Sequence, residues 1–89
     1  MTPLIRITRI KKRNGEIVSF DSGKIAVAIE KAFVTTRGGV DSAILQDIAQ
    51  TVLATLDNFF ADKVPGVEDV QNVVESALMN AGYFDVAKH

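Results

Sequence analysis

The stretch KKRNGEIVSFDSGKI, from Lys11 to Ile25, decides the fold because it joins a tight turn, a strand and the start of a helix. Asn14 and Gly15 are a turn signal between runs of strand-favouring residues, which together predict a β-hairpin. Asp21 then precedes an apolar pattern with helical spacing and fits an N-cap. We therefore expect the hairpin to lead directly into a first helix.

Two registers compete for the hairpin. A two-residue Asn-Gly loop would mix apolar and polar side chains on both faces of the strands. A three-residue loop over residues 13–15, with Gly15 in the left-handed conformation, sets Ile10 opposite Val18 and Thr8 opposite Phe20. We predict the second register because it gathers the apolar side chains on one buried face.

Apolar periodicity predicts three helices after the hairpin. The first should run from Ser22 to about Thr36, the second should be capped by Asp41 or Ser42 and reach about residue 60, and the third should follow Pro65. The inner faces are expected to be Ile25, Ala28, Ile29, Ala32 and Phe33 in the first helix, Ile44, Leu45, Ile48, Val52, Leu56 and Phe59 in the second, and Val67, Val70, Val74, Ala77, Leu78 and Ala81 in the third.

The last residues, YFDVAKH, could begin a fourth helix of about two turns. A helix this short has little stability of its own, so either it docks on the bundle or the chain is a fragment of a longer protein. The predicted fold class is α+β: a small bundle of three helices plus a truncated fourth, capped by an N-terminal β-hairpin. We expect residues 1–89 to be a single domain.

Composition narrows the function classes. The chain has 89 residues, is 47% hydrophobic and contains no cysteine. The absence of thiols excludes disulfides, thiolate metal sites and thiyl-radical chemistry, and we expect no catalysis by this chain. No apolar run reaches membrane-spanning length, so a cytoplasmic location without membrane partners is expected.

Charge is unevenly distributed along the chain. Residues 1–24 carry a net charge of +4, whereas the remaining residues carry −5. This asymmetry favours one localised anion site over a nucleic-acid-binding surface, although a basic hairpin could also meet a phosphate backbone. On charge alone, Lys12 and Arg13 would form a solvated turn. Lys24 at the start of the following helix strengthens the case for a phosphate site, and Lys11 is expected on the opposite strand face.

The roles of two polar residues, Asp21 and Gln71, each have two possible interpretations. Asp21 can act only as an N-cap, or it can also accept a hydrogen bond from a sugar or base. Gln71, at the edge of the third apolar stripe, can be structural or can recognise an adenine edge. The common phosphate-binding glycine motifs are absent, and His89 alone offers no metal or catalytic site.

KKRNGEIVSFDSGKI, together with VEDVQNVVESALMNAGYFDVAK, resembles the ATP-cone domain, a regulatory module at the N-terminus of many ribonucleotide reductases. The resemblance implies that Lys12, Arg13 and Lys24 contact phosphates. It also implies that Val18, Asp21 and Ile25 line the sugar and base region, which Val67, Val70 and Gln71 close. KVPGV could supply a third strand.

The resemblance further implies ATP or dATP as an allosteric effector, which Mg²⁺ can accompany. ATP would support the active reductase and dATP the inhibited one. The implied partners are the catalytic domain of the parent reductase and its radical-generating subunit. A transcriptional repressor of reductase genes also carries this domain and is the alternative, as is an interaction module for nucleic acid or protein.

Overall fold

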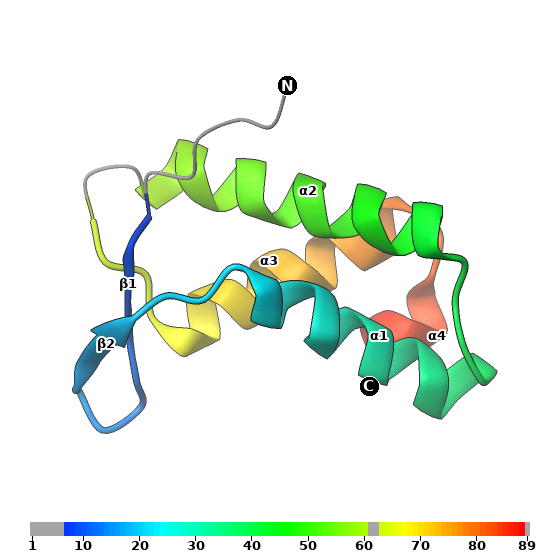
Figure 1. The fold of residues 1–89 in the computed structure, drawn as a ribbon, viewed down its shortest axis with the longest axis horizontal. Coiled ribbons are helices and arrows are strands. Elements are labelled where there is room, and N and C mark those ends of the chain that lie inside the picture. The colour runs from blue at the N-terminus through cyan, green and yellow to red at the C-terminus, as the bar shows by residue number, and fades with distance from the viewer. Residues whose placement is uncertain (1–6, 61–62, 89) are drawn as a thin grey trace.

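The computed structural model describes residues 7–60 and 63–88 of the chain. A hairpin is followed by helices in the order expected for the predicted α+β class (Figure 1). The elements are β1 (Arg9–Lys11), β2 (Ile17–Ser19), α1 (Gly23–Arg37), α2 (Ser42–Phe60), α3 (Val67–Asn80) and α4 (Phe84–Ala87). None of the helices in these residues is long and apolar enough to cross a membrane.

The hairpin has the predicted three-residue loop. Ile10 pairs with Val18 across the two antiparallel strands. The amide of Gly15 donates to the carbonyl of Lys12 at 2.9 Å, and Gly15 has a φ of 89°. The left-handed conformation that this loop requires is thus supplied by the one residue type that adopts it without steric cost.

The helix boundaries follow from side chains that accept hydrogen bonds from exposed backbone amides. Oδ1 of Asp21 accepts from the amide of Gly23 at 3.0 Å, but α1 begins at Gly23, one residue later than predicted, and its N-cap is Ser22, so the predicted N-cap at Asp21 is wrong by one position. Oδ1 of Asp41 accepts from the amide of Ala43 at 2.8 Å at the start of α2. These bonds satisfy amides that have no partner within the helix.

One buried cluster holds the helices together. Its largest members, Phe33 of α1, Leu56 of α2 and Leu78 of α3, are each no more than 2% exposed. The predicted inner face of α2 is wrong at both ends, because Ile44 is 39% and Phe59 is 72% exposed. The apolar stripe of α2 instead advances in steps of four residues at its end, so Phe60 packs against the core and Phe59 faces outward.

Ala81 and the expected third strand also depart from the sequence predictions. Ala81 is exposed just beyond the end of α3, where the helix is already turning toward Gly82. The segment around Pro65 forms only an isolated parallel bridge between Lys11 and Gly66, with the amide of Lys11 donating to the Pro65 carbonyl at 2.9 Å. Pro65 has no amide hydrogen of its own to extend the pairing.

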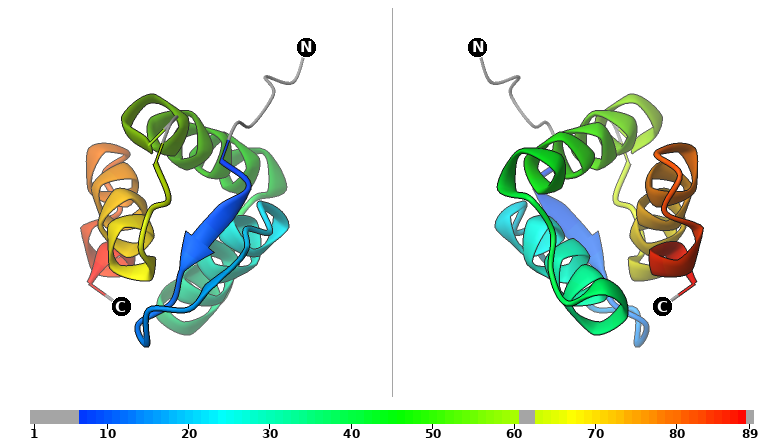
Figure 2. Two further views of the ribbon diagram at one scale, coloured as in Figure 1. Left: turned by 90° about the vertical axis from the view of Figure 1, so that its left-hand side faces the viewer. Right: turned by 90° about the vertical axis from the view of Figure 1, so that its right-hand side faces the viewer.

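The helices are arranged around α2. Both α1 and α3 pack against α2, and the short α4 packs against α1 and α3. Seen along the bundle, α1 and α3 lie on opposite sides beneath α2, and the hairpin lies at one end (Figure 2). The space between α1 and α3 is therefore bounded by the hairpin at one end and by α4 at the other.

Candidate functional site: two pockets joined at Arg13 and Gln71

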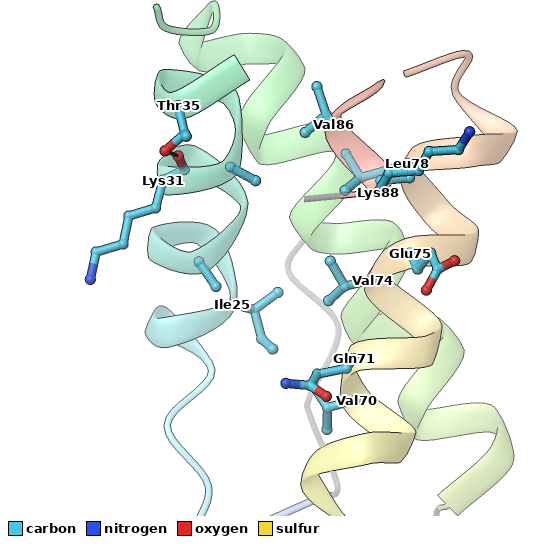
Figure 3. Close-up of a pocket in the computed structure, with 13 residues that line it drawn as sticks. Ile25, Lys31, Thr35, Val70, Gln71, Val74, Glu75, Leu78, Val86 and Lys88 are labelled. Atoms are coloured by element: carbon cyan, nitrogen blue, oxygen red, sulfur yellow. Dashed lines mark hydrogen bonds between the residues drawn. The ribbon is translucent and has the colours of Figure 1, made fainter. Parts of the chain in front are cut away.

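The first pocket, which we call the helix cleft, lies between α1 and α3 and has a volume of about 590 Å³. This size lies within the range of small-molecule binding sites. Ile25 of α1 and Gln71 of α3 face each other across it (Figure 3). Its lining consists of Ile25, Ala28, Lys31, Ala32 and Thr35 of α1, Val70, Gln71, Val74, Glu75 and Leu78 of α3, and Val86, Ala87 and Lys88 at the C-terminal end.

The walls of the helix cleft are mainly apolar. Ile25 and Val70 are buried, whereas Val74 is half-buried and Ala28 is exposed. Ala28 was expected on the inner face of its helix, and its small side chain borders the cleft instead. Apolar walls with a few polar groups at the edge suit a flat, weakly polar ring that is hydrogen-bonded at its rim.

The second pocket, which we call the hairpin pocket, lies between the β-turn and the start of α3 and has a volume of about 320 Å³. Lys11, Lys12 and Arg13 of the hairpin line one side, and residues 66–69 line the other. Lys11 was expected to face away from the site, but the bridge to Gly66 draws it to the pocket wall. Three cations beside a helix N-terminus form a favourable environment for an anion.

Two acidic residues reduce the positive charge of the hairpin pocket. Glu68 and Asp69 lie in the first turn of α3 and line the same pocket as the three cations. Oδ2 of Asp69 accepts a hydrogen bond from the amide of Gly66 at 2.8 Å, which commits one of its oxygens to capping the helix. An anion in this pocket would therefore bind on the hairpin side, where the cations are.

One hydrogen bond joins a lining residue of the hairpin pocket to a lining residue of the helix cleft. Nη2 of Arg13 donates to Oε1 of Gln71 at 3.4 Å, between an exposed residue of the hairpin and an exposed residue of α3. Arg13 lines the hairpin pocket and Gln71 lines the helix cleft. A ligand with an anionic tail and an apolar ring could occupy both pockets at once by passing this pair.

The two pockets include six of the nine residues expected at the site. Lys12, Arg13 and Val67 line the hairpin pocket, whereas Ile25, Val70 and Gln71 line the helix cleft. Val18, Asp21 and Lys24 belong to the lining of neither pocket. Val18 is half-buried on β2, the Asp21 carboxylate accepts a hydrogen bond from the amide of Gly23, and Lys24 is exposed at the start of α1.

Sequence reasoning missed the far end of the helix cleft. Thr35, Glu75 and Lys88 line it from three different elements, and no motif connects them. Lys31 also borders the cleft, but its chain extends away from α3 (Figure 3). The helical periodicity of α1 could have indicated Thr35, which follows Ala28 by seven residues and so shares its face.

Comparison with known proteins defines the class to which this architecture belongs. The ATP cone domain family matches residues 8–89, and the chain therefore belongs to that family.

The chain is also similar to parts of much longer enzymes. It is 35% identical over 89 residues to the ribonucleoside-diphosphate reductase subunit alpha of Chlamydia pneumoniae, covering 93% of this chain and 8% of that protein. It is 36% identical over 87 residues to the vitamin B12-dependent ribonucleoside-diphosphate reductase of Thermoplasma acidophilum, covering 92% and 11%. The chain thus spans about a tenth of the length of these relatives.

Proposed function

We propose that this domain binds ATP or dATP and controls the activity of a ribonucleotide reductase as an allosteric regulatory module. Membership of the ATP cone family supports a nucleotide-binding regulatory role. The observation that carries the proposal is the position of Arg13. Its side chain borders the cationic hairpin pocket and donates a hydrogen bond to Gln71, which borders the apolar helix cleft. This arrangement suits a molecule with a polyphosphate at one end and a purine at the other.

In this proposal the phosphates lie in the hairpin pocket against Lys12 and Arg13. Lys24 reaches them from the start of α1 with its flexible side chain. Ile25 and Val70 cover the base in the helix cleft, and the Gln71 amide reads its edge. Val18, Asp21 and Val67 border the sugar, for which Asp21 needs only the carboxylate oxygen that does not bond the Gly23 amide.

Magnesium would enter with the nucleotide. Within residues 7–60 and 63–88, no three His, Asp or Glu side chains gather as a metal site. Mg²⁺ commonly keeps several waters and binds through substrate phosphates with one or two carboxylates. Glu68, which lines the hairpin pocket, is the carboxylate best placed to support such an ion.

Regulation requires that the two nucleotides stabilise different states. ATP and dATP differ only in the 2′-hydroxyl. Discrimination therefore depends on a contact that senses this group, and on the effect of that contact on how this domain packs against other parts of the reductase. A coupling of this kind is typically worth about 1–3 kcal/mol. The partners in this proposal are the catalytic domain of the parent reductase and its radical-generating subunit, in the cytoplasm.

Calorimetric titration with ATP, dATP and GTP tests the proposal. The unmodified chain should show saturable binding that prefers adenine nucleotides. Lys12→Ala and Arg13→Ala should each weaken it about tenfold or more, because a hydrogen bond to a charged group contributes about 1.5–3 kcal/mol. Arg9→Ala is the matched control, since it removes a cation from β1 outside both pocket linings.

The same titrations at several salt concentrations separate this proposal from general polyanion binding. A basic hairpin that meets a phosphate backbone would bind with a steep salt dependence and would not discriminate among nucleotides. Absence of adenine-selective binding, or binding that Lys12→Ala and Arg13→Ala leave unchanged, would contradict the proposed function.

A further inference from the structure

A cluster of charged and aromatic side chains fastens α4 to the end of α1. Arg37, the last residue of α1, donates from Nε to Oδ2 of Asp85 at 2.9 Å and from Nη2 to Oδ1 at 2.8 Å. Cζ of Arg37 also lies 4.9 Å from the centroid of the Tyr83 ring. The Tyr83 ring in turn meets Phe33 edge-on, with centroids 5.0 Å apart and an interplanar angle of 75°.

These contacts determine where α4 lies. With four residues, α4 forms a single turn, which has no stability as an isolated helix. Three kinds of contact join it to the bundle: the buried side chain of Val86, which is 1% exposed, the ring contacts of Tyr83, and the paired hydrogen bonds between Arg37 and Asp85, whose side chains are about half exposed. The planar guanidinium matches both carboxylate oxygens, so it fixes orientation as well as distance.

The residues directly after Asp85 form one end of the helix cleft. Val86, Ala87 and Lys88 all belong to the cleft lining, although Arg37 and Asp85 do not. Val86 and Lys88 lie near Leu78, at the end of the cleft away from Gln71 (Figure 3). A rotation of this single turn about its buried Val86 would therefore displace the lining residues Ala87 and Lys88 that follow it.

We infer that Arg37 is a positioning residue for the ligand: through Asp85 and Tyr83 it holds α4 in the orientation that closes the far end of the helix cleft. The inference rests on the proposed nucleotide function, because the cleft is the proposed base pocket. Arg37 contacts no ligand in this scheme. It acts by keeping Val86 and Ala87 against the cleft.

Four variants test this inference on the full chain: Arg37→Ala, Arg37→Lys, the charge swap of Arg37→Asp with Asp85→Arg, and the control Arg9→Ala. Circular dichroism first confirms that each is folded. Hydrogen exchange without nucleotide then follows the amides of Ala87 and Lys88, which donate to the carbonyls of Tyr83 and Phe84. Exchange at these two amides should be faster in Arg37→Ala and should be unchanged in Arg9→Ala.

Calorimetric titration with ATP provides the second readout. Arg37→Ala should weaken binding by about 2- to 30-fold, the usual range for a residue that acts on a site through packed neighbours. The charge swap should recover much of the lost affinity, and Arg37→Lys should recover less because an ammonium group cannot make the paired hydrogen bonds.

The outcomes separate this inference from the proposed function. If the unmodified chain does not bind ATP, the proposed function fails and this inference fails with it. If the unmodified chain binds and Arg37→Ala binds equally well, only the inference is overturned. Unchanged exchange at Ala87 and Lys88 in Arg37→Ala would also overturn it, because α4 would then be held without Arg37.

Discussion

Arg13 and Gln71 are 58 positions apart in the sequence, yet the arginine Nη2 donates to the glutamine Oε1 at 3.4 Å. The bond ties the tip of the hairpin to the first half of α3. It also engages the amide oxygen of Gln71, so that the amide nitrogen remains directed toward α1 and the cleft (Figure 3). In this orientation Gln71 presents a hydrogen-bond donor to whatever the cleft contains.

The first prediction concerns base selectivity. Gln71→Leu replaces the amide with an apolar side chain of similar size, so the cleft keeps its shape but loses the hydrogen-bond donor. We expect the ratio of ATP affinity to GTP affinity to fall about tenfold, because the Gln71 donor can bond N1 of adenine, whereas N1 of guanine carries a hydrogen. A hydrogen bond contributes about 1 kcal/mol, and an unpaired polar edge costs more. Titration with both nucleotides measures this ratio. Asn72→Leu is the matched control, since Asn72 is an exposed amide of α3 outside the cleft lining.

The second prediction concerns the hairpin turn. At Gly15 no atom lies within 4 Å of an added Cβ, so a substitution there is opposed by the φ of 89° and not by crowding. Gly15→Ala should lower the free energy of unfolding by about 1 kcal/mol, whereas Gly15→Asn should cost less, because asparagine tolerates the left-handed region better. Urea denaturation measures both. Equal effects of the two variants would contradict this explanation.

The third prediction concerns the core beneath the cleft. Phe33 is 1% exposed, and its neighbour Val34 is 53% exposed. Phe33→Ala should lower the free energy of unfolding by about 3–5 kcal/mol, because it leaves a cavity and removes the edge contact with Tyr83. Val34→Ala should change it by less than about 0.5 kcal/mol. Denaturant titration of both variants measures the difference, and similar losses would show that α1 is oriented differently.

The fourth prediction concerns acid pH. Hydrogen bonds from Arg37 lower the pKa of Asp85 below its ordinary value of 3.8, and the same contact raises the pKa of Arg37. A lowered carboxyl pKa stabilises the fold above the unfolded-state pKa, and that stabilisation is lost as pH falls through the folded-state value. Asp85→Asn should therefore be less stable than the unmodified chain at pH 7, and the gap should close below about pH 4.

A double-mutant cycle provides the control for this pH effect. In an Arg37→Ala background, Asp85→Asn should have little effect on the free energy of unfolding at either pH, because the interaction is already absent. Urea denaturation at pH 7 and pH 3 measures all four proteins. A stability gap that persists unchanged at pH 3 would show that Asp85 acts through something other than its charge.

Local features of the fold could be predicted from the sequence because each depends on a few neighbouring residues. Gly15 specifies the loop, strand alternation specifies the pairing of Ile10 with Val18, and Asp21 marks the start of α1. The prediction failed at Phe59 because a 3.6-residue period leaves two candidates at the end of a long helix. Only the packing of Phe60 against the core decides between them.

The site could be predicted only in part. The hairpin cations and Gln71 were identified from charge, helix position and resemblance, and the structure brings Arg13 and Gln71 into contact. The far end of the cleft could not be predicted, because Thr35, Glu75 and Lys88 come from separate segments of the chain and the lining residues 86–88 depend on the placement of α4. That placement depends on Arg37 and Asp85, 48 positions apart, and no local pattern indicates the pair.

Helix α2 sets the separation between α1 and α3, the two helices that line the helix cleft. It contributes no residue to the lining of either pocket, yet α1 and α3 both rest on it. The width of the cleft therefore depends on buried side chains of α2, such as Ile48 and Val52, which lie outside the cleft lining. If the cleft is the base pocket of the proposed function, exchanging one of these for a larger or smaller residue would alter the width available to a base, and so the choice of nucleotide, without changing any residue of the cleft lining.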